Sequence, residues 1–149
     1  MKKKILMWIA SLMLTFSATY AKSNNTPVPS YISSIFSSDF NYANSVTWEE
    51  INGYYKVNFI EHGISFHAFY TSDGEFMGIG TYLRSDRLPA SLLTAVKEKY
   101  KGYWISDLFE FKVNNIPGYF ITLENADHKV MLKAEEDKTW TFYSEVKKG

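Results

Sequence analysis

The chain contains three histidines, the side chains best suited to metal ligation or proton transfer near neutral pH. His62 falls beside Gly63 in an expected turn, His67 lies within an expected strand, and His128 stands at the start of another. No two of them have the i, i+4 helical or i, i+2 strand spacing that brings two imidazoles to one ion. We interpret all three as surface or turn residues and predict no metal site.

Other residue types also fail to form a catalytic pattern. The chain has no cysteine, which excludes thiol catalysis and thiolate zinc sites. The serines at 33, 34, 37 and 38 fit the wet face of a helix, and no G-x-S-x-G elbow occurs. The sequence therefore predicts a protein that is not an enzyme and carries no cofactor.

Two short segments resemble ligand loops only superficially. Gly78-Ile79-Gly80 leads into a strand rather than a helix N-terminus, so we expect it to permit a bend or close packing, not to bind phosphate. The acidic residues 135–137 and the turn at 72–74 lack the spaced oxygen ligands of a calcium loop. Turn formation is the simpler interpretation of both acidic segments.

The N-terminal residues predict export. Three lysines at 2–4 precede an apolar run at 5–16, and Thr19-Tyr20-Ala21 fits the small-x-small pattern of a signal-peptidase site. We predict a signal peptide at 1–21, a flexible lead-in at 22–29 and a periplasmic or secreted protein. An uncleaved anchor is the alternative, against which the small residues argue. No second long apolar stretch would hold the mature chain in a membrane.

Removal of 21 residues from the 149 leaves 128, enough for one domain with a substantial core. The three leader lysines reduce the 16 basic residues to 13 against 16 acidic ones, a net charge of −3. A mildly acidic chain without a basic stripe argues against nucleic acid as a partner. Aromatic residues make up 17% of the chain and supply core area without disulfides.

Hydrophobic periodicity predicts a helix followed by four strands, twice. Apolar residues recur at helical spacing from Ile32 to Phe40, and period-two alternation then follows through residues 46–49, 55–59, 64–70 and 76–83. Asn52-Gly53 is a strong hairpin signal. A second helix opens at Leu88-Pro89 and stops near Gly102, and strands are expected at 104–113, 118–124, 128–135 and 139–146.

The two halves look like copies of one unit. A shift of 64 positions pairs Tyr55, Val57 and Phe59 with Tyr119, Ile121 and Leu123, and it places Phe36 opposite Tyr100. We predict one domain at 30–149, made of α-β4 repeats at 30–84 and 88–147. The fold class is α+β, with one eight-stranded antiparallel sheet and both helices on one face.

The other face of the sheet is expected to be open to solvent, as antiparallel sheets permit. Alternation assigns to it a mixture of aromatic, methionine and polar side chains, a composition typical of protein-binding surfaces. The alternative is that these side chains only shield the sheet. The predicted binding residues are Tyr54, Lys56, His67, Phe69, Met77, Phe120, Met131 and Tyr143, with Asn58, Ile79, Lys133 and Thr141 among their neighbours.

The segments at 36–40, 44–48 and 55–59, followed by Tyr70 and Asp73-Gly74, resemble a PepSY-like family of exported proteins. That family is common in the Bacteroidetes and related to the beta-lactamase inhibitor protein fold; Leu88-Pro89 and Tyr100 fit it too. The resemblance covers nearly all of the mature chain and implies tandem helix-plus-four-strand repeats and an exported location. It implies protein binding or inhibition as the kind of function, but Lys138 stands where a turn glycine is expected, so inhibition of beta-lactamase does not follow.

Three functions stay open at this point. The first is a binding module of the cell envelope that engages a protein, as an inhibitor or otherwise, through the open sheet face. The second is a carrier of a small molecule or glycan, in a concavity lined by Tyr54, Phe69, Met77 and Tyr143. The third is a hydrolase with a cryptic site that uses His67. The absence of a catalytic pattern favours the first.

Overall fold

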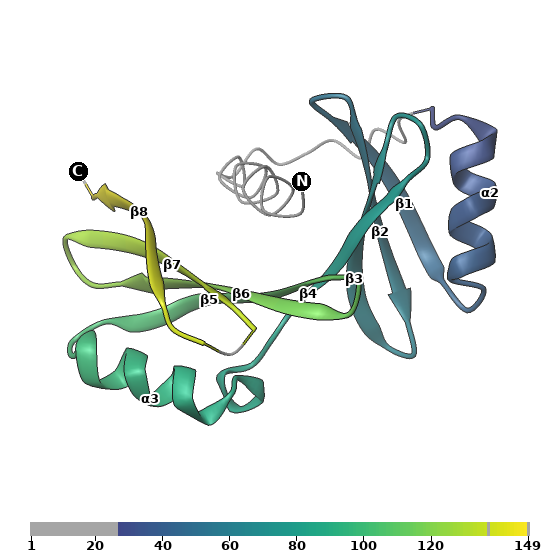
Figure 1. The fold of residues 1–149 in the computed structure, drawn as a ribbon. Helices are drawn as coiled ribbons and strands as arrows, with labels where there is room; N and C mark the ends of the chain where they lie inside the picture. The colour runs from purple at the N-terminus through teal and green to yellow at the C-terminus, as the bar shows by residue number, and fades with distance from the viewer. Residues whose placement is uncertain (1–26, 137, 149) are drawn as a thin grey trace. The chain divides into compact units, whose positions relative to one another are not determined.

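A computed structural model describes residues 27–136 and 138–148, so the predicted signal peptide and most of the lead-in lie outside the described residues. The chain forms two compact units, divided between Met77 and Gly78, which we call the first and second unit. The elements are α2 (Ser30–Asp39), β1 (Asn44–Ile51), β2 (Tyr54–Glu61), β3 (Ile64–Thr71), β4 (Phe76–Tyr82), the 3₁₀ turn η1 (Ser85–Arg87), α3 (Ala90–Lys99), β5 (Trp104–Val113), β6 (Ile116–Glu124), β7 (His128–Glu135) and β8 (Thr141–Lys147) (Figure 1).

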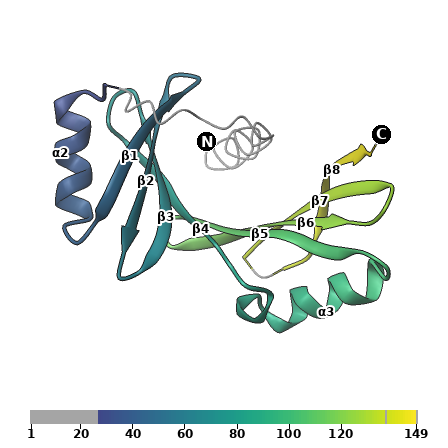
Figure 2. The same cartoon turned by 180° about the vertical axis from the view of Figure 1, so that it is seen from behind.

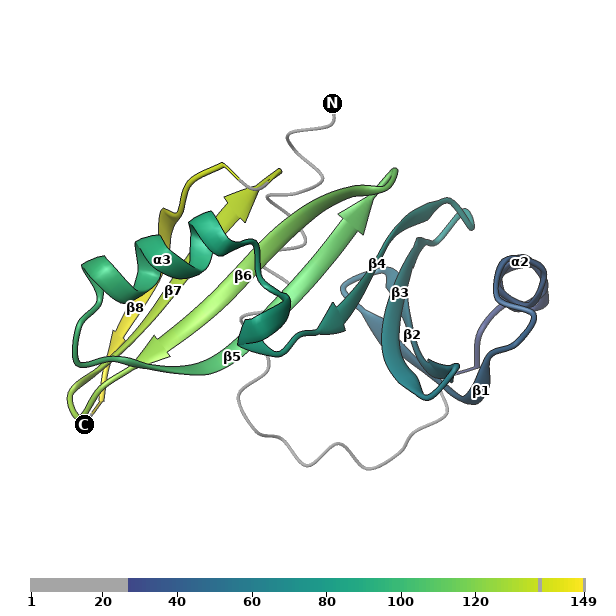
Figure 3. The ribbon, with the colours of Figure 1, turned by 90° about the horizontal axis from the view of Figure 1, so that it is seen from below.

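The strands form one antiparallel sheet in the order β1 to β8, and each strand neighbours those next to it in sequence. Among the described residues, two helices and a single eight-stranded meander confirm the predicted α+β fold class. Within the first unit, α2 lies along one side of β1 to β3 (Figure 2). Within the second unit, α3 lies across β6 and β7 (Figure 3).

Two-residue turns close the hairpins because their residues accept positive φ. Asn52 and Gly53 have φ values of 52° and 81°, and His62 and Gly63 have 50° and 79°. Both turns were predicted, and this geometry matches the twist of the flanking strands. The β5–β6 turn is instead Asn114-Asn115, so the predicted start of the sixth strand at residue 118 was too late. Pro117 lies inside β6, where its carbonyl accepts the Glu136 N–H at 3.0 Å.

Each helix begins directly after a proline. Pro29 and Pro89 are the N-caps of α2 and α3. Their carbonyls accept the first helical N–H groups, such as that of Ile32 at 3.0 Å and that of Leu93 at 3.0 Å. A proline is tolerated there because no intrahelical bond requires its missing N–H.

An aromatic cluster forms the core of the first unit. Ile32 and Phe36 of α2 are buried against the sheet. The Phe36 ring meets Trp48 edge-on with centroids 5.4 Å apart and Phe59 at 5.1 Å, while Trp48 approaches Tyr70 at 6.1 Å. Edge-to-face packing of this kind adds stability beyond the buried area.

The core of the second unit is mainly aliphatic. Leu88, Leu92 and Val96 pack on a sheet face of buried residues: Leu108, Tyr119, Ile121, Leu123, Val130, Leu132 and Ala134. Trp140 joins this cluster from the edge, and its indole Nε1–H donates to the Leu92 carbonyl oxygen at 2.8 Å. This bond attaches the chain before β8 to α3.

The repeat has two offsets rather than one. The helices and first strands of the units correspond at a spacing of 60, so that Phe36 matches Val96 and not Tyr100 as predicted. For the second and third strands the spacing is 64, as predicted: the register of β2 with β3 coincides with that of β6 with β7 at this offset, and β3 matches β7 over its whole length. The bounds of β4 and β8 differ by 65. The β5–β6 hairpin accounts for the change because its strands extend further toward their turn than those of β1–β2.

Candidate binding surface

Each unit has a face of its strands that points away from its helix, which we call its outer face. In the first unit this face carries two cross-strand rows. Thr47, Asn58 and His67 are direct neighbours across β1, β2 and β3, and Glu49, Lys56 and Phe69 form the adjacent row. Neighbours within such a row stand close enough for their side chains to interact.

The polar residues of these rows form a connected hydrogen-bonded network, which we call the polar ladder (Thr47, Glu49, Lys56, Asn58 and His67). Asn58 Nδ2 donates to Glu49 Oε1 at 2.6 Å, and Lys56 Nζ donates to the same oxygen at 3.3 Å. Asn58 Oδ1 lies 2.6 Å from His67 Nδ1, so the imidazole carries its proton on Nδ1 and donates it. The ladder holds its groups in fixed directions before any ligand arrives.

The expectation that Lys56 and Phe69 are exposed was wrong. Lys56 is only 3% exposed and Phe69 only 5%. Lys56 stands between Glu49 and Phe69 in one row, so its neighbours cover the methylene stem while its ammonium bonds to Glu49. Tyr54 and His67 are half-buried, and Met77 is half-buried beside Phe76 at the start of β4. The side chains of these three residues are accessible, and their role in binding stays a prediction.

The environment of His67 keeps its imidazole neutral. Partial burial and the nearby positive charge of Lys56 lower the pKa of His67 from 6.5 to about 4, although Glu49 opposes the shift. The ladder therefore presents one carboxylate, one ammonium and an uncharged imidazole at neutral pH. Nothing in this arrangement pairs a nucleophile with a base, so the hydrolase hypothesis gains no support from it.

Phenylalanine rings cover the outer face of the second unit. Phe109 and Phe111 of β5 are 5% and 2% exposed, and their rings lie over Gly80 and Gly78 of β4. A Cβ added at Gly80 would stand 2.2 Å from Phe109 Cζ, and one at Gly78 would stand 2.6 Å from Phe111 Cζ. The Gly78-Ile79-Gly80 segment thus permits close packing, as predicted.

This aromatic cover extends to the far edge of the unit through Phe120 and Tyr143. Phe120 is 5% exposed, so its expected exposure was also wrong; Phe109 flanks it on one side, and Tyr143 meets it edge-on at 6.2 Å. A bulge in the β7–β8 ladder between Met131 and Leu132 accompanies this placement of Tyr143. Met131 and Tyr143 are half-buried and remain accessible.

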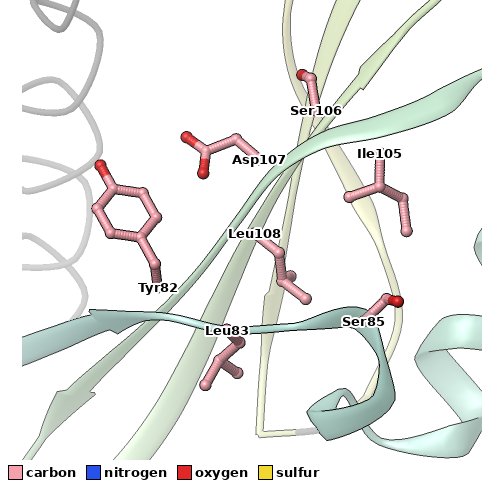
Figure 4. Close-up of a pocket in the computed structure, with 7 residues that line it drawn as sticks. All are labelled: Tyr82, Leu83, Ser85, Ile105, Ser106, Asp107 and Leu108. Carbon is pink, nitrogen blue, oxygen red and sulfur yellow. The ribbon is translucent and has the colours of Figure 1, made fainter. Parts of the chain in front are cut away.

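A pocket of about 230 Å³ lies where β4 separates from β5, and we call it the β4–β5 pocket. Its lining residues are Tyr82, Leu83, Ser85, Ile105, Ser106, Asp107 and Leu108 (Figure 4). Partial burial raises the pKa of the Asp107 carboxyl, although the Leu108 N–H and the charge of Lys129 oppose the shift. Burial and the Asp107 charge raise the pKa of Tyr82.

No motif in the sequence indicates this pocket, because its lining residues are of ordinary types. The signal that could have indicated it is the break in alternation at Ile105 to Asp107, where the β5–β6 register shifts. A second pocket of about 250 Å³ is lined by Lys133, Glu135, Lys138, Thr139 and Thr141. Neither pocket is lined by the residues that we assigned to a glycan carrier.

A charged cluster at the end of β8 was also missed. Lys148 Nζ lies 2.7 Å from Glu124 Oε2, donates to the Asn125 carbonyl at 2.9 Å and stands 5.0 Å above the Trp104 ring. Hydrogen bonds from Lys148 and Ser106 lower the pKa of Glu124 to about 2. Because these groups satisfy one another, we interpret the cluster as an attachment of the C-terminal segment.

Within residues 27–136 and 138–148, no group of three or more histidine and acidic side chains is arranged to hold a metal ion. Over the same residues no helix is long and apolar enough to span a membrane.

Solved structures with the same fold exist, but no family model and no curated protein matches the chain. A BLIP-like protein from Bacteroides fragilis superposes with a TM-score of 0.70 at 20% identity, over 83% of this chain and 89% of that one. A DUF2874 family protein from Bacteroides uniformis gives 0.72 at 13% identity, over 81% and 90%. A protein from Bacteroides eggerthii, provisionally described as periplasmic, gives 0.72 at 14% identity, over 81% and 89%. The fold is therefore BLIP-like; membership of the PepSY-like family stays a prediction.

Proposed function

We propose that this chain is an exported binding module of the cell envelope that engages a protein partner through its outer faces and performs no catalysis. The observation that carries the proposal is the polar ladder, in which five linked side chains hold charged and amide groups in fixed directions on a sheet face. A network whose directions are fixed before binding loses little conformational entropy when a partner docks.

The accessible residues on the outer face of each unit suit protein recognition. Tyr54 adjoins the ladder on β2, and Tyr143 and Met131 stand at the rim of the aromatic cover. Tyrosine and methionine provide large contact areas at interfaces, and tyrosine is enriched among the residues that carry binding energy. The buried Lys56, Phe69 and Phe120 then support the accessible residues instead of contacting the partner.

Two further observations agree with the proposal. The predicted mature chain is acidic, which favours a partner with a basic surface. The Bacteroides eggerthii protein that is provisionally described as periplasmic shares this fold, which agrees with export.

A carrier of a small molecule or glycan is less well supported, because both described pockets are smaller than the roughly 300–1,000 Å³ typical of ligand sites.

Site-specific photocrosslinking in living cells tests the proposal. A photoreactive phenylalanine analogue replaces Tyr54 or Tyr143 in the exported full chain, and a matched control replaces Glu98, which is exposed on α3. We expect at least one outer-face position to give an adduct with one defined envelope protein that Glu98 does not give. Adducts of equal yield from all three positions, or none from either outer face, would contradict the proposal.

The purified partner then allows affinity to be separated from folding. Tyr54→Ala or Tyr143→Ala is expected to weaken binding at least about tenfold, while Tm changes little because both side chains are only half-buried. Equal affinity of both variants and the parent chain would exclude these residues from the interface.

A further inference from the structure

The β4–β5 pocket opens because two paired strands separate. Leu83 N–H still donates to the Leu108 carbonyl at 2.9 Å, but the ladder of β4 and β5 ends at the Tyr82–Phe109 pair, and the chain then turns into η1. Beyond this point β5 pairs with β6 only, and the register of that pair shifts between Ile105 and Asp107. The pocket is therefore a consequence of strand geometry and exists without a ligand.

Its two sides differ in chemistry. The Asp107 carboxylate and the Tyr82 ring point to one side of β5, and the aliphatic side chains of Leu83, Ile105 and Leu108 point to the other (Figure 4). A carboxylate beside an aromatic ring attracts an organic cation through charge and through the ring quadrupole. The aliphatic side chains on that other side belong to the core of the second unit or pack against it, so a cation would reach the pocket from the side of Asp107 and Tyr82.

The charges of the chain itself leave room for an external cation. No described basic group lies within ion-pairing distance of Asp107: Arg84 pairs with Asp86 at 3.5 Å, and Lys129 pairs with Glu124 at 3.5 Å. Arg87 is exposed on η1. Lys129 acts on Asp107 only as a more distant positive charge, which weakens but does not replace a direct contact.

We propose that the β4–β5 pocket binds a guanidinium or ammonium group on a short aliphatic stem. This inference rests on the proposed function, on which the group is an arginine or lysine side chain of the protein partner. At about 230 Å³ the pocket accommodates one such side chain and is too small for an oligosaccharide.

Amide NMR titration of the purified chain with n-butylguanidinium and n-butylammonium tests the pocket directly. We expect saturable shifts at Ser85 and at residues 105–108 with either cation, and none with neutral n-butanol. Asp107→Asn is expected to weaken binding about tenfold or more, since a hydrogen bond to a charged group is lost. Glu98→Gln removes the same charge from an exposed site on α3 and should leave the titration unchanged.

The outcomes separate this inference from the proposed function. Equal shifts with butanol, or unchanged binding by Asp107→Asn with an unperturbed amide spectrum, would overturn the cation site. If the cations bind and Asp107→Asn lowers the photocrosslinking yield from Tyr54 or Tyr143, the cation belongs to the protein partner. If the cations bind and that yield is unchanged, the occupant is a free amine, and the assignment to a partner side chain is wrong.

Discussion

The two units fold the same pattern of elements with different side chains at equivalent positions. Phe36 and Trp48 in the first unit correspond to Val96 and Leu108 in the second, and Phe59 corresponds to Leu123. The first helix thus packs on aromatic rings, and the second packs on aliphatic side chains. What the units share is the order of apolar and polar positions, not the size of the residues.

Neighbouring positions compensate for one another in volume. Ala68 and Tyr70 on β3 correspond to Leu132 and Ala134 on β7, so that the large side chain moves by two positions along the strand. All four are buried, with exposures of 0% to 3%. Cores tolerate such exchanges when the total volume and the pattern are kept. The comparison teaches that each unit has its own close-packed solution.

The outer faces differ even more. The first unit places a polar ladder there, with a carboxylate, a buried ammonium and a neutral imidazole. The second unit places phenylalanine rings over glycines. On the proposed function, the outer face of the first unit gives directional polar contacts. The outer face of the second unit provides a rigid apolar support for Met131 and Tyr143 at its own rim.

Exchange of an equivalent core residue is expected to have the largest effect. Phe36→Val copies Val96 but leaves a cavity among Trp48, Phe40 and Phe59, which we expect to destabilise the chain by about 2–3 kcal/mol. The reverse change, Val96→Phe, overpacks the second core and should cost about 1–3 kcal/mol. Urea denaturation measures both. A neutral result for both would mean that the two cores are interchangeable.

Gly80→Ala should be the next most damaging change. The new Cβ would stand 2.5 Å or less from two atoms of the buried Phe109 ring and 3.1 Å from the Glu110 carbonyl oxygen. We expect a loss of about 2 kcal/mol in unfolding free energy, measured by urea denaturation. Phe109→Leu should partly rescue Gly80→Ala in the double variant, because it removes the clashing ring atoms. Strictly additive losses would contradict this account of the aromatic cover.

His67 makes the first unit sensitive to acid. The folded chain binds the imidazole proton less tightly than the unfolded chain, so stability falls as the pH drops through 6.5 and the loss is complete near pH 4. In His67→Gln, the fall in unfolding free energy over this window, measured by urea denaturation at several pH values, should be smaller by about 1 kcal/mol after allowance for solvent screening. His62→Gln, at an exposed turn, is the matched control. Identical pH profiles for parent and His67→Gln would refute the assignment.

The smallest effect is expected at Tyr70. Its hydroxyl is buried and has no hydrogen-bond partner among the described residues, and burial raises the pKa of this phenol. Tyr70→Phe removes an unsatisfied group while keeping the ring against Trp48 and Phe76, so it should be neutral or stabilise by up to about 1 kcal/mol. Thermal unfolding measures the change. A clear loss of stability would show that the hydroxyl has a partner after all.

The sequence by itself determined the elements and their order. Period-two alternation from Tyr55 to Phe66, the Asn52-Gly53 and His62-Gly63 turns and the helix after Pro89 follow from local preferences that neighbours in sequence impose. The antiparallel meander then follows because tight turns join successive strands. Comparison of the two halves also indicated the repeat, with the correct spacing for β2 and β3 against β6 and β7.

Tertiary structure alone decided which outer-face residues are accessible. Alternation assigns Lys56, Phe69 and Phe120 to the face away from the helix, but it does not report how closely cross-strand neighbours cover them. The β4–β5 pocket was equally hidden, because it depends on where two strands separate and where one of them bulges. Side-chain direction is a local property of the backbone, whereas burial and cavities depend on segments distant in sequence, such as β1 and β3 on either side of Lys56.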